Sequence, residues 1–162
     1  MADIYFSKWD DLVNAVDNKL SVILEKDVAP IAEEILKKHI KSDIYDAYTP
    51  KENGWVNGTT YQRRHVLEEA VTSIMLDKNT VLITSTATAS PSIVNGWSFH
   101  NRYPGAFLKL IESGNTGIWK NGFPRPAVSN TQDEIDNSNQ IASAIKRGIK
   151  REIGIYQIPS LS

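Results

Sequence analysis

The first forty residues alternate apolar and polar side chains with the period of an α-helix. Apolar side chains recur every three or four positions at Trp9, Leu12, Val13, Val16, Leu20, Ile23 and Leu24. The same spacing resumes from Val28 to Ile40. Because residues three and four positions apart share one face of a helix, this pattern predicts a helical segment over residues 7–42 with one apolar stripe.

This helical segment contains one proline and two capping signals. Pro30 lacks an amide donor and clashes with the preceding turn, so it predicts either a kink or a fresh start with Asp27 as the cap. Ser7, followed three positions later by Asp10, resembles a capping box with aspartate in the glutamate role. We therefore expect a bent helix or two stacked helices.

Residues 43–90 predict a loop and then a hairpin. The stretch 43–65 is rich in Tyr, Asn, Gly and Thr, which favours an irregular loop. Residues 66–76 fit both a helical face and a strand, and the "DKN" that follows is typical of a turn. The run 80–88 is rich in Thr, Val and Ile and needs a partner, so we predict strands over about 70–77 and 80–87.

The last part of the chain predicts a short helix, an irregular arm and a final helix. Residues 106–113 form an amphipathic pattern that Gly114 ends, and glycines and prolines prevent regular structure over about 115–130. Thr131 and Glu134 match a capping box, which predicts a helix over 131–153. The predicted buried stripe of this helix is Ile135, Ala142, Ile145, Ile149 and Ile153. Its opposite, basic edge is Lys146, Arg147, Lys150 and Arg151.

Length and composition predict a single domain over residues 1–162. The chain is 41% hydrophobic, enough for one modest core. A net charge of -1 gives no overall field for wrapping nucleic acid or coating an anionic membrane. The lack of cysteine excludes disulfides and thiolate zinc sites. Early acidic residues and the absence of a long apolar run predict a soluble protein of a cytoplasm-like compartment, with no signal peptide and no membrane contact.

Charge is distributed unevenly along the chain. Residues 1–50 hold ten acidic and six basic side chains, whereas residues 51–129 hold five acidic and eight basic ones. The acidic excess fits a solvated helix face, and it also fits head-to-tail contact between copies. Arg63 and Arg64 could meet a phosphate or a carboxylate, and pairing with the acidic first helix, of the same or a neighbouring copy, is the favoured reading.

The sequence predicts no catalytic, cofactor or metal site. His39, His65 and His100 lie far apart without ligand spacing, and the chain has neither a GxSxG elbow nor a glycine-rich phosphate loop. Adjacent carboxylates such as Glu33 and Glu34 point about 100° apart on a helix, so they cannot flank one bond together. We therefore expect a protein that is not an enzyme and needs no cofactor.

Aromatic side chains gather in the predicted loops. The chain has four Trp and six Tyr, and many of them lie in irregular segments beside Gly and Pro, as Trp97 and Trp119 do. Aromatic and Arg side chains on ordered loops are typical of protein interfaces, whereas the alternative is that these loops pack as lids on the core. The arm at 115–130 is therefore predicted to contact another chain.

Four stretches of the chain are "DIYDAYTPK", "YQRR", "LEEAV" and "FLKLIESGNTGIWKNGFPRPAVSNTQDEI", in this order. Over about residues 44–155, this order resembles the head–tail joining or tail-completion proteins of tailed bacteriophages, also described as neck, minor capsid or morphogenesis proteins. The resemblance implies an α+β fold in which a small antiparallel sheet is flanked by the first and last helices, with long ordered loops between them. The loop 91–103 is longer than the resemblance leads us to expect, and its role stays open.

The resemblance also implies a function. Copies would form a ring in the virion neck, between the portal, adaptor or head-closure protein and the tail, with DNA passing through unbound and assembly in the host cytoplasm. Tyr61, Arg63 and Arg64 would fix a loop or a neighbour contact, and Phe123, Pro124, Arg125 and Pro126 would shape the arm. Two alternatives stay open. One is a tail-terminator or tail-tube subunit, and the other is a small enzyme or nucleic-acid-binding regulator that uses Arg63, Arg64 and the basic edge of the last helix as its contact surface.

Overall fold

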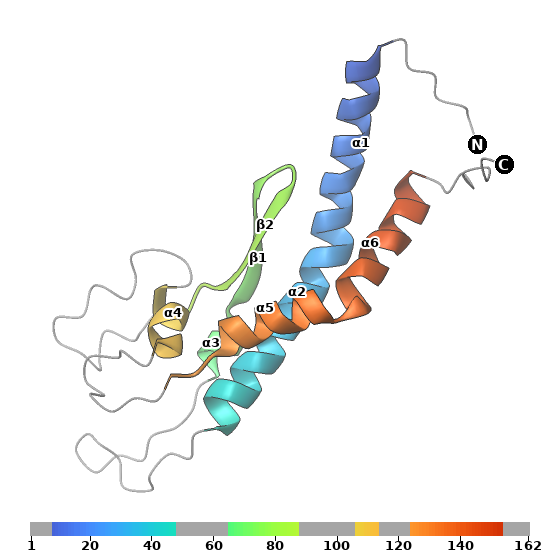
Figure 1. Cartoon of the computed structure of the whole chain (residues 1–162). Helices are drawn as coiled ribbons and strands as arrows, with labels where there is room; N and C mark the ends of the chain where they lie inside the picture. The colour runs from blue at the N-terminus through green and yellow to red at the C-terminus, as the bar shows by residue number, and fades with distance from the viewer. Residues whose placement is uncertain (1–7, 48–64, 88–105, 114–123, 154–162) are drawn as a thin grey trace, which may run out of the picture.

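A computed structural model of the chain describes residues 8–47, 65–87, 106–113 and 124–153 (Figure 1). Its elements are α1 (Trp9–Ile23), the π-helical η1 (Leu24–Val28), α2 (Ala29–His39), the π-helical η2 (Ile40–Asp46), α3 (Val66–Glu69), β1 (Val71–Asp77), β2 (Thr80–Ser85), α4 (Ala106–Glu112), α5 (Ala127–Asn137) and α6 (Asn139–Glu152). The fold is mostly helical with one two-stranded antiparallel sheet in the described residues, so the α+β prediction is confirmed.

The N-terminal helix runs without a break from Trp9 to Asp46 because two π-helical turns connect its α-helical parts. Pro30 lies in the first turn of α2, where its missing amide donor is tolerated. The predicted cap Asp27 is wrong, because Val28 is the N-cap and no side chain caps this end. The predicted end at residue 42 is also wrong, since burial of Ile44 and Tyr45 extends the helix.

The start of α1 differs from the predicted capping box. Lys8 is the N-cap residue, and its side chain makes no capping hydrogen bond. Ser7 lies outside the described residues, so its part in the predicted box stays a prediction. Asp10 lies in the first turn of α1, where a negative charge complements the helix dipole.

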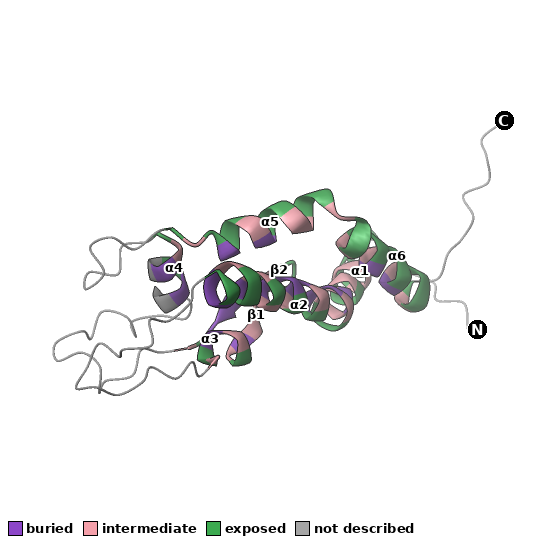
Figure 2. Ribbon diagram, turned by 90° about the horizontal axis from the view of Figure 1, so that it is seen from below, coloured by how far each residue is buried: buried purple, intermediate pink, exposed green. Residues whose placement is uncertain are grey.

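Helix α2 makes contacts with several other elements. It packs against both strands of the β1–β2 hairpin and against α5, which lies beside it in Figure 2. The core on these interfaces consists of Leu36, Ile40, Ile44, Tyr45, Leu67, Val71, Leu108, Ile111 and Ala127. Because α2 contributes to both interfaces, its buried residues cover more than one face of the helix.

The hairpin confirms the predicted strands and settles the ambiguity over 66–76. The first residues of that stretch form the short helix α3, and the rest form β1. Val71 pairs with Ser85 at the buried end, and Ile74 pairs with Leu82 toward the turn. Burial decreases from Val71, 8% exposed, to Leu76, 61% exposed. The hairpin therefore has one end in the core and one end in solvent.

The backbone of Leu67 is buried where α3 meets the hairpin, and two side chains satisfy it. The Leu67 amide donates to the Tyr45 hydroxyl at 3.1 Å, and the Ser85 hydroxyl donates to the Leu67 carbonyl at 2.8 Å. A buried backbone group left without a partner costs about 1–3 kcal/mol. These two bonds therefore fix α3 between η2 and β2.

Tyr45→Phe is expected to lower the free energy of unfolding by about 1–2 kcal/mol, because it removes the acceptor of the buried Leu67 amide without removing the ring. Urea denaturation followed by circular dichroism measures the change. Thr86→Val, which removes an exposed hydroxyl bonded to Ala70, is the control and should cost less. A Tyr45→Phe chain as stable as the wild type would contradict this role.

A second core joins α1, η1 and α6. Ile23, Val28 and Ala144 are buried there. The half-buried side chains packed against them are Leu20, Leu24, Ile31, Ile141, Ile145 and Ile149. Gly148 lies so close to Ile23 that a Cβ at this position would be 2.6 Å from Ile23 Cγ2. The glycine thus allows the close approach of α6 to α1.

The final helix predicted over 131–153 is two helices. Helix α5 begins at Ala127, so the predicted irregular structure over 127–130 is wrong. Thr131 does not cap a helix, because it lies inside α5 and its hydroxyl donates to the Ala127 carbonyl at 2.6 Å. Ser138 separates α5 from α6 with extended backbone and caps α6 by accepting from the Gln140 amide at 3.5 Å.

The predicted buried stripe of the last helix is partly wrong. Ala144 and Gly148 are the buried positions of α6, whereas Ala142 and Ile153 are exposed. Ala142 lies one position beyond Ile141, which packs on the second core, and Ile153 is the C-cap residue after the end of α6. The predicted basic edge, in contrast, is exposed along its whole length.

Candidate interaction surface

Most of the predicted interaction residues lie outside the part of the chain that the structure describes. These are Tyr61, Arg63, Arg64, Trp97, Trp119 and Phe123. Three others, Pro124, Arg125 and Pro126, are described and lead directly into α5. The interaction roles predicted for the residues outside the described ranges therefore stay predictions. Pro124, Arg125 and Pro126 show where the predicted arm meets α5.

Helix α4 anchors the end of the arm. The Arg125 amide donates to the Glu112 carbonyl at 3.2 Å. The Glu112 carboxylate accepts from the Ser129 amide at 2.8 Å and from the Ser129 hydroxyl at 2.6 Å. Pro126, the N-cap of α5, makes no side-chain capping bond, so Glu112 caps α5 from another helix. Pro124 and Pro126 are exposed, and Arg125 is half-buried.

Glu112→Ala is expected to cost about 1 kcal/mol of folding free energy, because it removes the acceptor for the first turn of α5. Thermal unfolding followed by circular dichroism measures the loss. Glu69→Ala, at an exposed carboxylate of α3, is the matched control. If both variants unfold at the wild-type temperature, Glu112 does not cap α5.

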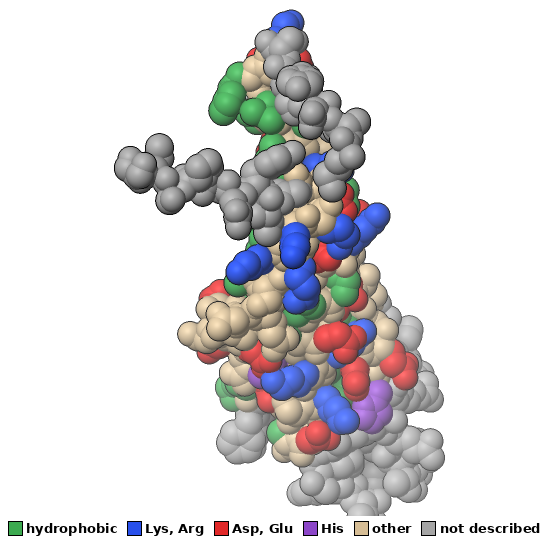
Figure 3. All heavy atoms as spheres, turned by 90° about the vertical axis from the view of Figure 1, so that its right-hand side faces the viewer, with side chains coloured by type: hydrophobic (Ala, Val, Ile, Leu, Met, Phe, Trp, Pro, Cys, Tyr) green, Lys and Arg blue, Asp and Glu red, His purple; other side chains and the backbone are tan. Residues whose placement is uncertain are grey.

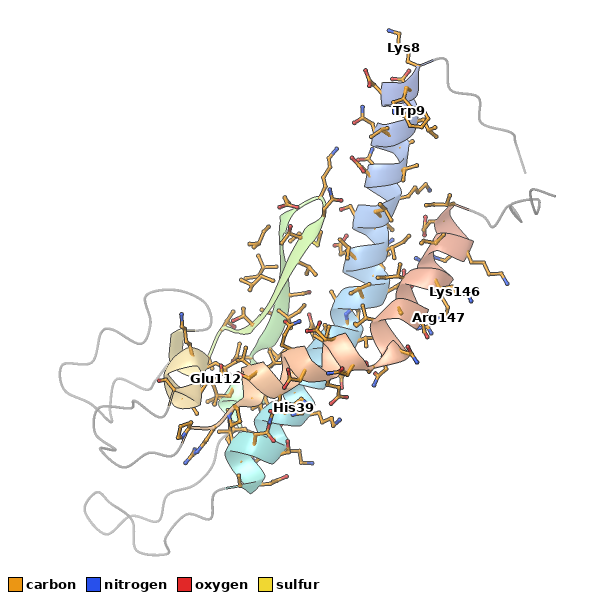
Figure 4. The ribbon with its side chains drawn as sticks, in the orientation of Figure 1. Lys8, Trp9, His39, Glu112, Lys146 and Arg147 are labelled. Carbon is orange, nitrogen blue, oxygen red and sulfur yellow. The ribbon has the colours of Figure 1, made fainter. Side chains whose placement is uncertain are left out.

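A cluster of polar side chains joins α2 and η2 to α5. His39 contacts Asp43 through Nδ1 at 3.0 Å and Glu134 through Nε2 at 2.9 Å. Lys38 Nζ donates to the same Glu134 carboxylate at 2.6 Å, and Asn130 Nδ2 donates to Asp43 at 2.9 Å. Each ring nitrogen of His39, which Figure 4 labels on α2, therefore lies within hydrogen-bond distance of a carboxylate.

The two carboxyl groups of this cluster have lowered pKa values. Burial raises the pKa of Asp43, whereas hydrogen bonds from Ser42, Asn130 and His39 lower it. The hydrogen bonds together outweigh burial, so the net shift of this pKa is downward. The hydrogen bond from Lys38 is the main cause of the lowered pKa of Glu134, and desolvation opposes it. Sequence reasoning missed this cluster because its partners are far apart along the chain.

Ion pairs hold α6 against the N-terminal helix. The Arg151 guanidinium donates two hydrogen bonds to the Asp27 carboxylate, both at 2.7 Å, and these bonds lower the pKa of Asp27. Lys19 contacts Glu152 at 3.3 Å. One acidic residue of the first segment, Asp27, therefore pairs with Arg151 at the basic end of α6, and Lys19 pairs with Glu152 with the charges reversed. The predicted pairing of Arg63 and Arg64 stays untested.

Comparison with known proteins identifies the family to which the chain belongs. A family model described as YomN matches residues 8–151, which is most of the chain. The chain belongs to the YomN family. No curated protein and no solved structure matches it. The family takes its name from a gene product of a Bacillus prophage of the SPbeta type, which indicates a phage-encoded protein.

The first half of α1 in this YomN-family chain extends beyond the body of the molecule (Figure 1). The Lys19–Glu152 contact marks the level at which α6 ends beside α1. Beyond it, Trp9 is 75% exposed and Val13 is 39% exposed. They belong to the same apolar row as Leu20, which packs on α6. The described YomN-family structure thus leaves an apolar helix face uncovered.

The outer face of α6 carries positive charge. Lys146, Arg147 and Lys150 are exposed, and Lys and Arg side chains gather on this side of the molecule (Figure 3). Lys146 and Arg147 extend from α6 on the side away from α1 (Figure 4). Beside them, a shallow cleft is lined by Ile31, Asn139, Gln140, Ser143 and Arg147.

Within the described ranges, no group of three His, Cys, Asp or Glu side chains could hold a metal ion. In the same part of this YomN-family chain, no helix has the length and hydropathy to cross a membrane. The candidate interaction surface consists of the apolar face of α1 and the basic face of α6.

Proposed function

We propose that this phage protein is a structural component of the virion that joins the head to the tail. Copies of the chain form a ring in the neck of the particle and have no catalytic activity. The portal, adaptor or head-closure protein binds one side of the ring, and tail proteins bind the other. Assembly takes place in the host cytoplasm, and DNA passes through the ring.

The exposed apolar face of α1 is the observation that carries this proposal. Trp9 lies at the tip of a helix that stands out from the core, with 75% of its surface exposed. An exposed apolar face rimmed by charged residues is typical of a protein–protein interface. A protein whose helix needs a partner to bury this face fits a role in assembly.

The charge of the chain fits the passage of DNA. Many Lys and Arg contacts with phosphates would bind DNA tightly, with an affinity that rises steeply as salt is lowered. A net charge of -1 avoids a strong attraction of this kind over the whole chain. The membership in a phage-derived family supports the same setting.

Deletion of the gene from its prophage tests the proposal. After induction, electron microscopy should show DNA-filled heads and separate tails, and a plasmid copy of the gene should restore complete particles. Complete particles without the gene would contradict the proposal. Tails of abnormal length on otherwise joined particles would assign the chain to the tail terminator instead.

A further inference from the structure

The apolar row of α1 is longer than the surface that covers it. Leu20 and Ile23 pack against α6, whereas Trp9 and Val13 lie in the same row beyond the end of α6. Asp10 and Asp17, seven residues apart, follow one edge of this row at helical spacing. We name residues 9–17 the α1 arm. It presents an apolar strip with an acidic edge.

The outer face of α6 has the complementary pattern. Lys146 and Lys150 are one helical turn apart and exposed, and no ion pair to either is found within the described ranges. Ala142 and Ile153 are exposed along one flank of these lysines at helical spacing. This face therefore presents two exposed apolar side chains beside a basic edge, over a span of about 16 Å, against about 12 Å for the α1 arm at about 1.5 Å of rise per residue.

The two surfaces do not meet within one copy. The opposite face of α6, with Ala144 and Gly148, already packs on the α1 and η1 of its own chain. The outer face of α6 consequently points away from its own α1, as the positions of Lys146 and Arg147 in Figure 4 show. Among the described residues neither surface has a partner, and a second copy of the chain carries both complements.

We infer that the α1 arm of one copy docks on the outer face of α6 of the next copy. Trp9 and Val13 lie against Ala142 and Ile153, and the acidic edge faces the two lysines. The two contacting surfaces differ, so the contact is heterologous, and repeated contacts of this kind close a ring when the rotation permits. This inference rests on the proposed ring and names the interface within it.

Cross-linking of mixed single-cysteine chains tests the inference. The natural chain has no cysteine, so Val13→Cys and Ala142→Cys each introduce one thiol, on chains with tags of different mass. A short bismaleimide should link the two chains in the mixture and should not link either variant to itself. Val13→Cys chains linked to one another would indicate paired α1 arms and overturn the inference. The absence of any link would also overturn it.

Charge reversal gives a second, independent readout. Lys146→Glu with Lys150→Glu should weaken self-association about ten-fold in low salt, measured by sedimentation velocity. Adding Asp10→Lys with Asp17→Lys to the same chain should restore it. The matched control, Lys41→Glu with Lys78→Glu, changes the net charge equally at exposed positions elsewhere and should have little effect.

The outcomes separate this interface from the proposed ring. Ring-sized oligomers that survive the reversal of both lysines would overturn the interface and leave the ring standing. A wild-type chain that stays monomeric would overturn the interface directly. Reversal of the lysines that abolishes binding to a short DNA duplex without changing self-association would assign the basic face to nucleic acid, which also overturns the inference.

Discussion

Gly148→Val is expected to lower the free energy of unfolding by about 1–3 kcal/mol, because overpacking of a buried helix contact forces the surrounding structure to shift. The new Cβ would lie 2.6 Å from Ile23 Cγ2 and 2.9 Å from Ile23 Cγ1. Ile23 is 1% exposed, so it has little free space to move into. Urea denaturation followed by circular dichroism measures the effect, with Ser143→Val at an exposed position of the same helix as the control.

The close contact between Gly148 and Ile23 also predicts that a second substitution, at Ile23, reduces the destabilisation caused by Gly148→Val. Ile23→Ala alone should cost about 2–5 kcal/mol, because it leaves a cavity in the core between α1 and α6. Combined with Gly148→Val, its cost should be smaller than the sum of the two single effects, since the valine fills part of the space. Additive effects, or a Gly148→Val chain as stable as the wild type, would contradict the close packing of the two helices.

The second large effect is expected at the carboxylates that hold His39. Glu134→Gln should cost about 1–3 kcal/mol at neutral pH, because it removes the charged acceptor of both His39 and Lys38. Glu69→Gln, at an exposed carboxylate of α3, serves as the control. Chemical denaturation of both variants measures the difference. Equal stability would show that the cluster does not hold α5 on α2.

The lowered pKa values of Asp43 and Glu134 set the pH dependence of this effect. A carboxyl group with a lowered pKa in the folded state stabilises the fold fully above its ordinary pKa of about 4, and this stabilisation is lost as the pH falls through the folded-state value. The free energy of unfolding should therefore fall as the pH is lowered below about 4. Glu134→Gln should make this fall less steep, and an unchanged slope would contradict the assignment.

Local patterns in the sequence were enough to predict the hairpin. Residues 80–85 combine β-branched side chains with a turn before them, and a two-stranded hairpin needs only its neighbour in sequence as a partner. The N-terminal helix was predictable for the same reason, since its apolar period is continuous. The π-helical turns of this helix were not predictable. Pro30 indicates that the helix is disturbed near this position, but the sequence does not indicate which backbone conformation accommodates the proline.

The break between α5 and α6 shows where a sequence pattern can mislead. Thr131 and Glu134 have the spacing of a capping box, yet Glu134 bonds to Lys38 and His39 on another helix. The stretch of Asp, Asn and Ser at 136–139 is the signal that marks the true break, because these side chains favour helix caps and turns. A capping-box pattern that falls inside a run of helical apolar spacing therefore does not mark a helix start when tertiary contacts hold its side chains elsewhere.

The hydrogen bonds between side chains and residues far apart in the sequence could not be predicted from the sequence. Glu112 caps α5 from a different helix, and His39 contacts a carboxylate 95 positions away. No periodicity links such residues, since their meeting depends on the path of the whole chain. The basic edge of α6 was found because it depends on helical spacing alone, and its exposure follows from the burial of the opposite face.

The most direct test of the proposed ring is the mass of the purified chain in solution, measured by light scattering alone and after mixing with the head connector of its phage. We expect a ring-sized multiple of the 18.1 kDa chain, or a smaller species that binds the connector. A monomer that does not bind the connector but binds a DNA duplex in low salt would contradict the proposed role.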